Sequence, residues 1–289
     1  MIEVKMKKII ERLLIFFIGI PAVILIVLYL PFYRNLAVNL IVIFFSGMGA
    51  VEFSNMLEKK QIKISKIESF ILGALLPIVM TLYVSFNFSA LWVSSLISAG
   101  IIWAFLSKIF PRQTEIESIT GRITGCFSLI VYPGFFMCWM VLMGIWEFPA
   151  AVLLFLFITF GSDSLAWLFG SLFGANNRGL ITVSPNKSIA GFIGGLLGSV
   201  LVAIGAVLIF PDIFNIQGSS SIIIAAVILG LFTGIAAILG DLAESAIKRS
   251  CDFKDSGNFM LGRGGVLDCL DSIAVAAPVF FFLFTLFFR

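Results

Sequence analysis

The sequence predicts an all-α integral membrane protein with about nine transmembrane helices and a polar cavity that faces the cytoplasm. Of its 289 residues, 60% are hydrophobic and only 12% are charged, whereas soluble domains carry about 25% charged residues. The apolar residues form long unbroken runs rather than the alternating ten-residue segments of an outer-membrane barrel. This composition cannot cover a surface that faces water, so it excludes a soluble protein.

Nine apolar stretches are long enough to cross a bilayer, which takes about 20 residues. They lie at about 13–32, 36–53, 69–87, 88–107, 122–146, 149–172, 190–210, 221–240 and 272–288. The first follows a basic start but lacks a cleavage pattern, so we expect it to be retained. The third and fourth nearly touch at Asn87 and Phe88, which predicts a tight hairpin. The fifth and sixth are separated only near 147–149.

The distribution of charge predicts the orientation. With nine spans, all but two of the 19 Lys and Arg residues fall on one side, and the exceptions are Arg34 and Arg289. Because cations accumulate in cytoplasmic connections, we expect a cytoplasmic N-terminus and an outside C-terminus, with a bacterial inner membrane as the location. The four Cys have no regular spacing and His is absent, which argues against a disulfide framework or a zinc site.

No linker divides the chain, so we expect one polytopic membrane domain, 1–289. Within it, 1–148 would supply helices for packing and lipid contact, and 149–289 would carry the polar chemistry. All but two of the 16 Asp and Glu residues lie on the cytoplasmic side or in a span that leads to it. The longest cytoplasmic connections, 173–189 and 241–271, are therefore the expected place of function.

Residues 241–272 form a dense polar island between two apolar spans. If the eighth span continues as a helix past Gly240, the spacing i, i+3, i+4, i+7 places one set on a single face: Asp241, Glu244, Ser245 and Lys248. A second set with i, i+3, i+4 spacing begins the ninth span: Asp268, Asp271 and Ser272. Between the sets, Gly264 and Gly265 allow a ligand to approach the backbone closely.

Carboxylates that converge at a membrane edge need a cation, and oxygen ligands without His suit Mg²⁺. The neighbouring cations suit phosphates: Lys248, Arg249, Lys254 and Arg263. Bound Mg²⁺ with Lys and Arg is what phosphoryl or nucleotidyl transfer requires. The alternative is that these cations follow the positive-inside rule and bind headgroups, while the acids pair with them.

The polar island resembles a known signature. The pattern is Ser245-x-Ile247-Lys248-Arg249-x4-Lys254-Asp255-x-Gly257-x2-Met260, then Gly264-Gly265-x2-Asp268-x2-Asp271-Ser272. It is similar to the signature of the phosphatidate cytidylyltransferases, or CDP-diacylglycerol synthases. An upstream block also matches that family: Asp163, Ala166, Gly170, Ser184-Pro185-x-Lys187-Ser188 and Gly191-x2-Gly194-Gly195. The resemblance covers at least the C-terminal half.

The resemblance implies a nucleotidyltransferase that converts CTP and phosphatidate to CDP-diacylglycerol and pyrophosphate, with Mg²⁺ and optionally a second cation such as K⁺. It implies metal-associated carboxylates at Asp241, Asp268 and Asp271. With Asp268 and Asp271, it implies as catalytic residues Lys248, Arg249 and Lys254. We expect the substrates to contact Ser184, Lys187, Ser245, Asp255, Arg263, Gly264, Gly265, Asp163 and Glu244. The expected partners are CTP, phosphatidate or a related lipid phosphate, and membrane lipids; a homodimer is an option and nucleic acid is not expected.

The chain departs from the family pattern at a few positions. Leu261-Gly262-Arg263 replaces the usual Pro-Gly-His, Cys269 replaces Arg, and Ala190 replaces Glu. The alternatives are therefore a CTP-dependent transferase or kinase acting on another lipid, and a weak paralogue or lipid-binding scaffold. A transporter is disfavoured because few charges lie on the far side.

Two acids inside spans have alternative roles. Asp163 is costly in an apolar stretch, which favours a functional role over hydrogen bonding to Ser162 or Ser164. Glu52 either reaches the site or serves as a cap or ion-pair partner near Lys59 and Lys60.

Overall fold

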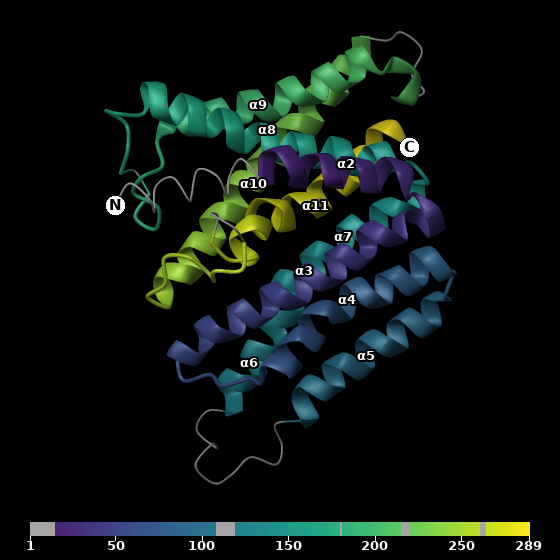
Figure 1. Cartoon of the computed structure of the whole chain (residues 1–289), viewed down its shortest axis with the longest axis vertical. Helices are drawn as coiled ribbons and strands as arrows, with labels where there is room; N and C mark the ends of the chain where they lie inside the picture. The colour runs from purple at the N-terminus through teal and green to yellow at the C-terminus, as the bar shows by residue number, and fades with distance from the viewer. Residues whose placement is uncertain (1–14, 108–118, 180, 215–219, 261–263) are drawn as a thin grey trace. The chain divides into compact units, whose positions relative to one another are not determined.

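The computed structural model describes residues 15–107, 119–179, 181–214, 220–260 and 264–289, and this part of the chain contains helices and no strand. The helices are α2 (Ile20–Tyr29), α3 (Phe32–Lys59), α4 (Lys66–Phe86), α5 (Ala90–Leu106), α6 (Ile119–Leu129), α7 (Phe136–Leu142), α8 (Pro149–Phe173), α9 (Ile189–Ile209), α10 (Ser220–Ser250) and α11 (Leu267–Phe288) (Figure 1). Short π turns precede α2 and join α6 to α7, and 3-10 turns follow α7 and α9.

Seven helical stretches among the described residues are long and apolar enough to cross a bilayer. The apolar segments Phe17–Tyr29 and Ala90–Leu106 are shorter. Each of the nine predicted stretches thus coincides with an apolar helix, and the protein is a multi-pass, all-helical membrane protein. The exact count of nine spans and the cavity remain predictions.

The chain divides into two compact units, which are described separately. Unit 1 comprises residues 1–149 and 250–270, and unit 2 comprises residues 150–249 and 271–289. The first boundary falls where the sequence changes from packing helices to polar chemistry. The sequence did not anticipate that 250–270, most of the signature segment, would pack with the N-terminal helices; a single polytopic domain stays a prediction.

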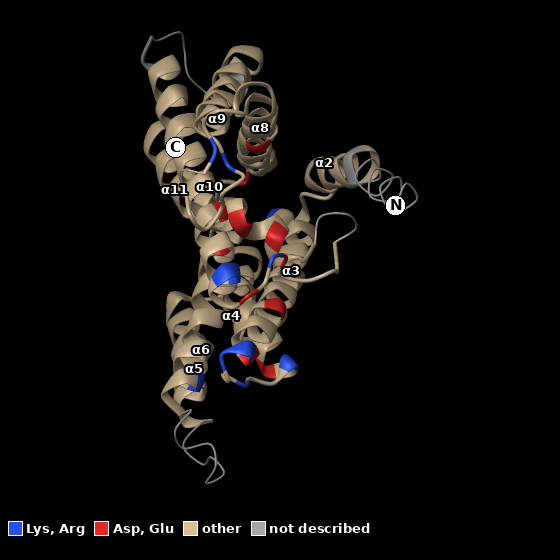
Figure 2. Ribbon diagram, turned by 90° about the vertical axis from the view of Figure 1, so that its left-hand side faces the viewer, with Lys and Arg blue, Asp and Glu red and all other residues tan. Residues whose placement is uncertain are grey.

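In unit 1, α4 lies between α3 and α5 and also contacts α7 (Figure 1). The α3–α4 contact is close because Gly73 faces Ala50 and the carbonyl of Ser46, where a Cβ would overlap both. The predicted hairpin between the third and fourth spans is confirmed, since Asn87 ends α4 in the left-handed conformation with φ 56° and α5 begins at Ala90. Charged residues gather at the end of α3 that leads into α4 (Figure 2).

Two prolines lie inside helices of unit 1, and the hydroxyl of Ser46 lies near one carbonyl in each helix. Pro77 lacks an N–H and therefore frees the carbonyl of Gly73, while Pro133 lies in the π turn Ile130–Phe135. The Ser46 hydroxyl lies 2.8 Å from the carbonyl of Gly73 and 2.5 Å from that of Pro133, so it can donate to either. Bonds of this kind make proline tolerable inside a membrane helix.

Arg34 joins three connections at the opposite end of unit 1. Its guanidinium donates to the carbonyl of Val84 at 2.9 Å, to Asn87 Oδ1 at 3.2 Å and to Glu147 Oε1 at 3.1 Å. Residues 33–35 have φ values of 50°, 55° and 63°, a left-handed turn that is unfavourable for L-residues. The hydrogen bonds of Arg34 help to offset that cost.

In unit 2, glycines allow the helices to pack closely. On α9, Gly194 faces Leu165 and Phe169 of α8, and Gly198 faces the carbonyl of Gly161. On α10, Gly230 and Gly234 face Ser199 of α9. These contacts are those expected of small residues at GxxxG spacing in membrane helices. Phe155 and Phe280, with ring centroids 5.2 Å apart, join α8 to α11.

Candidate functional site

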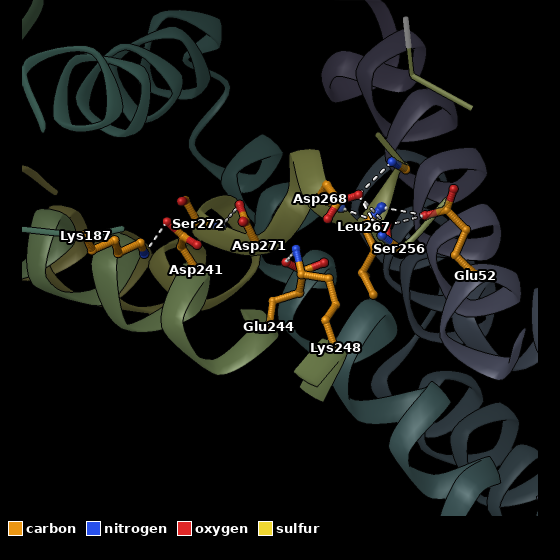
Figure 3. A network of polar contacts seen from close by, with 11 residues as sticks. Glu52, Lys187, Asp241, Glu244, Lys248, Ser256, Leu267, Asp268, Asp271 and Ser272 are labelled. Carbon is orange, nitrogen blue, oxygen red and sulfur yellow. Dashed lines mark hydrogen bonds and ion pairs between the residues drawn. The ribbon is translucent and has the colours of Figure 1, made fainter. Parts of the chain in front are cut away.

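The end of α10 supplies the polar face that the sequence predicts. The helix continues without a break past Gly240 to Ser250, so Asp241, Glu244 and Lys248 do lie on successive turns of one face (Figure 3). With 31 residues, α10 is about 46 Å long, well beyond the roughly 30 Å of a hydrocarbon core. Its last turns can therefore carry charge at the headgroup level.

Lys187 forms an ion pair with Asp241 and reaches it from the connection between α8 and α9 (Figure 3). A turn holds the lysine in place. The backbone N–H of Lys187 donates to the carbonyl of Ser184 at 3.1 Å, and the backbone N–H of Ser184 donates to the carbonyl of Ile181 at 3.1 Å. Both side chains of the pair are partly exposed, 24% for Lys187 and 32% for Asp241. Lys187 thus lies against the polar face of α10, and contact of Ser184 and Lys187 with a substrate stays a prediction.

Asp271 on α11 belongs to the same group of charges. The acids near it are Asp241 and Glu244 on α10 and Asp163 on α8. Its Oδ1 accepts a hydrogen bond from the backbone N–H of Ser272 at 2.5 Å. α10 and α11 are close here because Gly240 lies against the carbonyl of Asp271, where a Cβ would overlap. Acids of α8 and α10 therefore lie near Asp271 of α11 in unit 2.

Glu244 and Lys248 form a buried ion pair one turn apart on α10. Glu244 is fully buried, and Lys248 is 8% exposed. Two charges taken out of water need each other, because the desolvation cost of either one alone is large. This pair therefore has a structural role in addition to any contact with a substrate.

In unit 1, the carboxylate of Asp268 is held by the segment that precedes it (Figure 3). Its Oδ2 accepts hydrogen bonds from the backbone N–H of Ser256 at 2.8 Å, the hydroxyl of Ser256 at 2.9 Å and the backbone N–H of Gly265 at 2.7 Å. The hydroxyl of Ser256 also accepts from the N–H of Asp268 at 3.2 Å. Asp268 is thus fixed in orientation at the first turn of α11.

Glu52 of α3 binds the same segment. Its side chain is buried, with 6% exposure. Oε1 accepts from the N–H of Val266 at 3.0 Å, and Oε2 accepts from the N–H of Leu267 at 2.9 Å and the hydroxyl of Ser256 at 2.9 Å. Of the alternatives that the sequence left open, the structure supports a cap, and the helix capped is α11, more than 200 residues away.

Three glycines of the signature segment face these carboxylates. A Cβ on Gly257 or Gly265 would overlap a carboxylate oxygen of Glu52, and a Cβ on Gly264 would lie 2.6 Å from Asp268 Oδ2. Gly264 also has φ +100°, a conformation that L side chains rarely adopt. The groups that lie close to these glycines within unit 1 are thus the chain's own acids. The close approach of a ligand stays a prediction.

The remaining predicted residues have these places. Asp163 is exposed on α8, Ser245 is half-buried and Arg249 exposed on α10, and Lys254 and Asp255 are exposed in the segment after α10. Arg263 lies outside the described residues. In the described ranges, no group of three or more His, Cys, Asp or Glu is close enough together to hold a metal ion. By donor chemistry, the carboxylates of Asp241 and Asp271 fit a hard cation such as Mg²⁺.

The fold is that of a multi-pass helical membrane protein, and the lysines that lie beside carboxylates on its polar face are groups that can pair with phosphate oxygens. The cytidylyltransferase family profile matches residues 10–287. The chain therefore belongs to the cytidylyltransferase family.

Individual relatives agree with that assignment. A phosphatidate cytidylyltransferase of Bacillus subtilis (strain 168) is 29% identical over 249 residues, which cover 83% of this chain and 87% of the relative. Another from Staphylococcus saprophyticus is 40% identical over 118 residues, 41% of this chain and 42% of the relative. An uncharacterised protein of Escherichia coli (strain K12) is 33% identical over 147 residues, 50% of this chain and 46% of the relative.

Proposed function

We propose that this protein transfers a cytidylyl group from CTP to phosphatidate, giving CDP-diacylglycerol and pyrophosphate for phospholipid biosynthesis. The observation that carries the proposal is the group of charges in unit 2, where Lys187 and the carboxylates of Asp241 and Asp271 meet. Family membership and the names of the relatives support the same reaction.

The chemistry suits this set of residues. An oxygen of the lipid phosphate attacks the α-phosphorus of CTP, a new P–O bond forms, and the bond to the β-phosphate breaks so that pyrophosphate leaves. The nucleophile is already anionic, so positioning and neutralisation of charge matter more than a strong base. Lys187 would neutralise phosphate oxygens, and the resemblance assigns the same role to Lys248, Arg249 and Lys254.

Asp241 and Asp271 would hold Mg²⁺, whereas a metal-associated role for Asp268, which lies in unit 1, is implied by the resemblance alone. When bound, the cation would neutralise charge on the triphosphate and on the leaving pyrophosphate. Lys187 is paired with Asp241 in this structure, so binding of the cation would release Lys187 from that carboxylate to neutralise phosphate oxygens instead.

The proposal includes a place and an orientation. The protein would lie in a bacterial inner membrane with its N-terminus in the cytoplasm, where CTP is available, while phosphatidate enters from the bilayer. The bacterial relatives and the clustering of Lys and Arg on one side support this arrangement.

The test is an assay of the purified, detergent-solubilised protein with CTP, phosphatidate and Mg²⁺, following CDP-diacylglycerol and pyrophosphate. Asp271→Asn should lower turnover by about 100-fold or more, since it removes a charge from the reacting centre. Asp252→Asn is the matched control, because Asp252 is exposed and its φ of 63° suits Asn. Its rate should equal that of the wild type.

Two outcomes would contradict the proposal. Equal rates for Asp271→Asn and the wild type would show that Asp271 has no role in the reaction. A wild-type protein that binds CTP or phosphatidate without forming product would instead indicate another lipid acceptor or a scaffold.

A further inference from the structure

Glu52 is a buried acid that the proposed reaction does not use. It lies on α3, far from the polar face of α10 in sequence, and its exposure is 6%. A carboxylate that is taken out of water needs hydrogen bonds to offset its desolvation. Among the described residues, the donors that hydrogen-bond to its carboxylate are Ser256, Val266 and Leu267, so the cost of burying Glu52 is offset by the segment that contains them.

The contacts of Glu52 fix the start of α11. The N–H groups of Val266 and Leu267 lie at the beginning of that helix, where backbone donors have no partner within the helix. A negative charge at this end is also favourable for the helix dipole. Glu52 therefore acts as an N-terminal cap that is supplied by a different helix.

One hydroxyl links this cap to a signature carboxylate. Ser256 Oγ lies 2.9 Å from Glu52 Oε2 and 2.9 Å from Asp268 Oδ2. A hydroxyl has a single hydrogen, so it can donate fully to only one of the two oxygens at a time. A change in the charge or position of Glu52 must therefore alter the hydrogen bond that orients Asp268.

The glycines agree with this reading. Gly257 and Gly265 both lie so close to the Glu52 carboxylate that a Cβ on either residue would overlap one of its oxygens. Glycine at these two positions of the signature is thus explained by the approach of an acid from α3.

We propose that Glu52 is a positioning residue of the cytidylyl transfer, which acts through Ser256 and the first turn of α11 to orient the Asp268 carboxylate. This inference rests on the proposed function for its effect on rate, and on the structure alone for its effect on α11. Glu52 is not assigned any contact with substrate.

Glu52→Gln is the variant of choice. The amide keeps the size of the side chain but replaces one acceptor oxygen with an NH₂ donor that faces other donors. We expect kcat to fall by about 10- to 100-fold, as it does when a residue that orients a metal-binding side chain is changed. The KM for CTP should stay within about threefold of the wild-type value. Glu58→Gln is the matched control, because Glu58 is an exposed acid six residues further along α3.

Ser256→Ala provides a second route to the same effect. It removes the shared hydroxyl and leaves both backbone bonds to Glu52, so its kcat should also fall, by less than that of Glu52→Gln. The double variant should be no worse than Glu52→Gln alone, since both changes break one chain of contacts.

Labelling of Cys269 gives a readout that does not depend on activity. Cys269 lies in the first turn of α11 with intermediate exposure, whereas Cys126, Cys138 and Cys251 are buried. The rate of maleimide addition at Cys269, followed by mass spectrometry, should rise severalfold in Glu52→Gln and stay unchanged in Glu58→Gln.

The two readouts separate the possible failures. If the wild type forms no product, the proposed function fails and the labelling rate alone decides the inference on α11. An unchanged labelling rate in Glu52→Gln would overturn the inference, whatever happens to activity. Faster labelling with wild-type kcat would overturn the role in catalysis.

Discussion

Lys187 reaches Asp241 from a connection between helices, so its position depends on the turn that begins at Ser184. We expect Lys187→Gln to lower kcat/KM for CTP by about 100-fold, because the charge that we propose neutralises phosphate oxygens is lost. Arg178→Gln is the control, since Arg178 is an exposed cation of the same connection. Steady-state kinetics check the prediction, and equal losses in both variants would show only a general effect of charge.

The buried pair of Glu244 and Lys248 allows stability to be separated from activity. Lys248→Met should lower the free energy of unfolding by about 3–5 kcal/mol, because it leaves Glu244 buried as an uncompensated charge. Glu244→Leu in addition should restore most of that loss while activity stays low. Thermal unfolding in detergent measures this, and a double variant less stable than Lys248→Met would contradict it.

The sequence predicted much of the residue-scale chemistry and missed one part of it. Helical spacing was enough to place Asp241, Glu244 and Lys248 on one face, because that relation is local. The partnership of Glu52 with Ser256 and Leu267 could not be predicted, because it joins residues more than 200 positions apart. The available signal was an acid inside an apolar span, which indicates that a partner exists without identifying it.

At the scale of the helix, α9 offers two glycines with opposite surroundings. A Cβ on Gly198 would overlap the carbonyl of Gly161 and approach Leu165, whereas nothing lies within 4 Å of a Cβ on Gly205. Gly198→Leu should therefore destabilise the protein by about 1–3 kcal/mol or more through overpacking, and Gly205→Leu should have little effect. Thermal unfolding of the two variants in the same detergent tests this, and equal midpoints would show that α8 and α9 do not pack through Gly198.

The sequence located the helices well because long apolar runs depend only on composition along the chain. It did not predict the π turn at Ile130–Phe135 or the left-handed turn at residues 33–35. The first was indicated by Pro133 alone. The second depends on the hydrogen bonds of Arg34 to distant Val84 and Asn87, which no local pattern reveals.

At the scale of the whole molecule, the number of spans determines on which side of the membrane each terminus lies. The predicted nine spans, with positive connections on one side, would place the two termini on opposite sides of the membrane. A phosphatase reporter that is active only outside the cytoplasm should be active when fused after Arg289 and inactive when fused before Met1. Activity of neither fusion would indicate an even number of spans, and the 17-residue helix α5 would be the first candidate for one that does not cross.

The link between Glu52 and the start of α11 has a consequence for the synthesis of the chain itself. α3 is made early and α11 last, so while the chain is being synthesised the acid resides in an apolar helix before Val266 and Leu267 have been made. Chains normally fold from the N-terminus during synthesis, and an unsatisfied acid in a membrane helix is costly. The start of the last helix therefore supplies two backbone donors that the Glu52 carboxylate lacks in any shorter intermediate of synthesis.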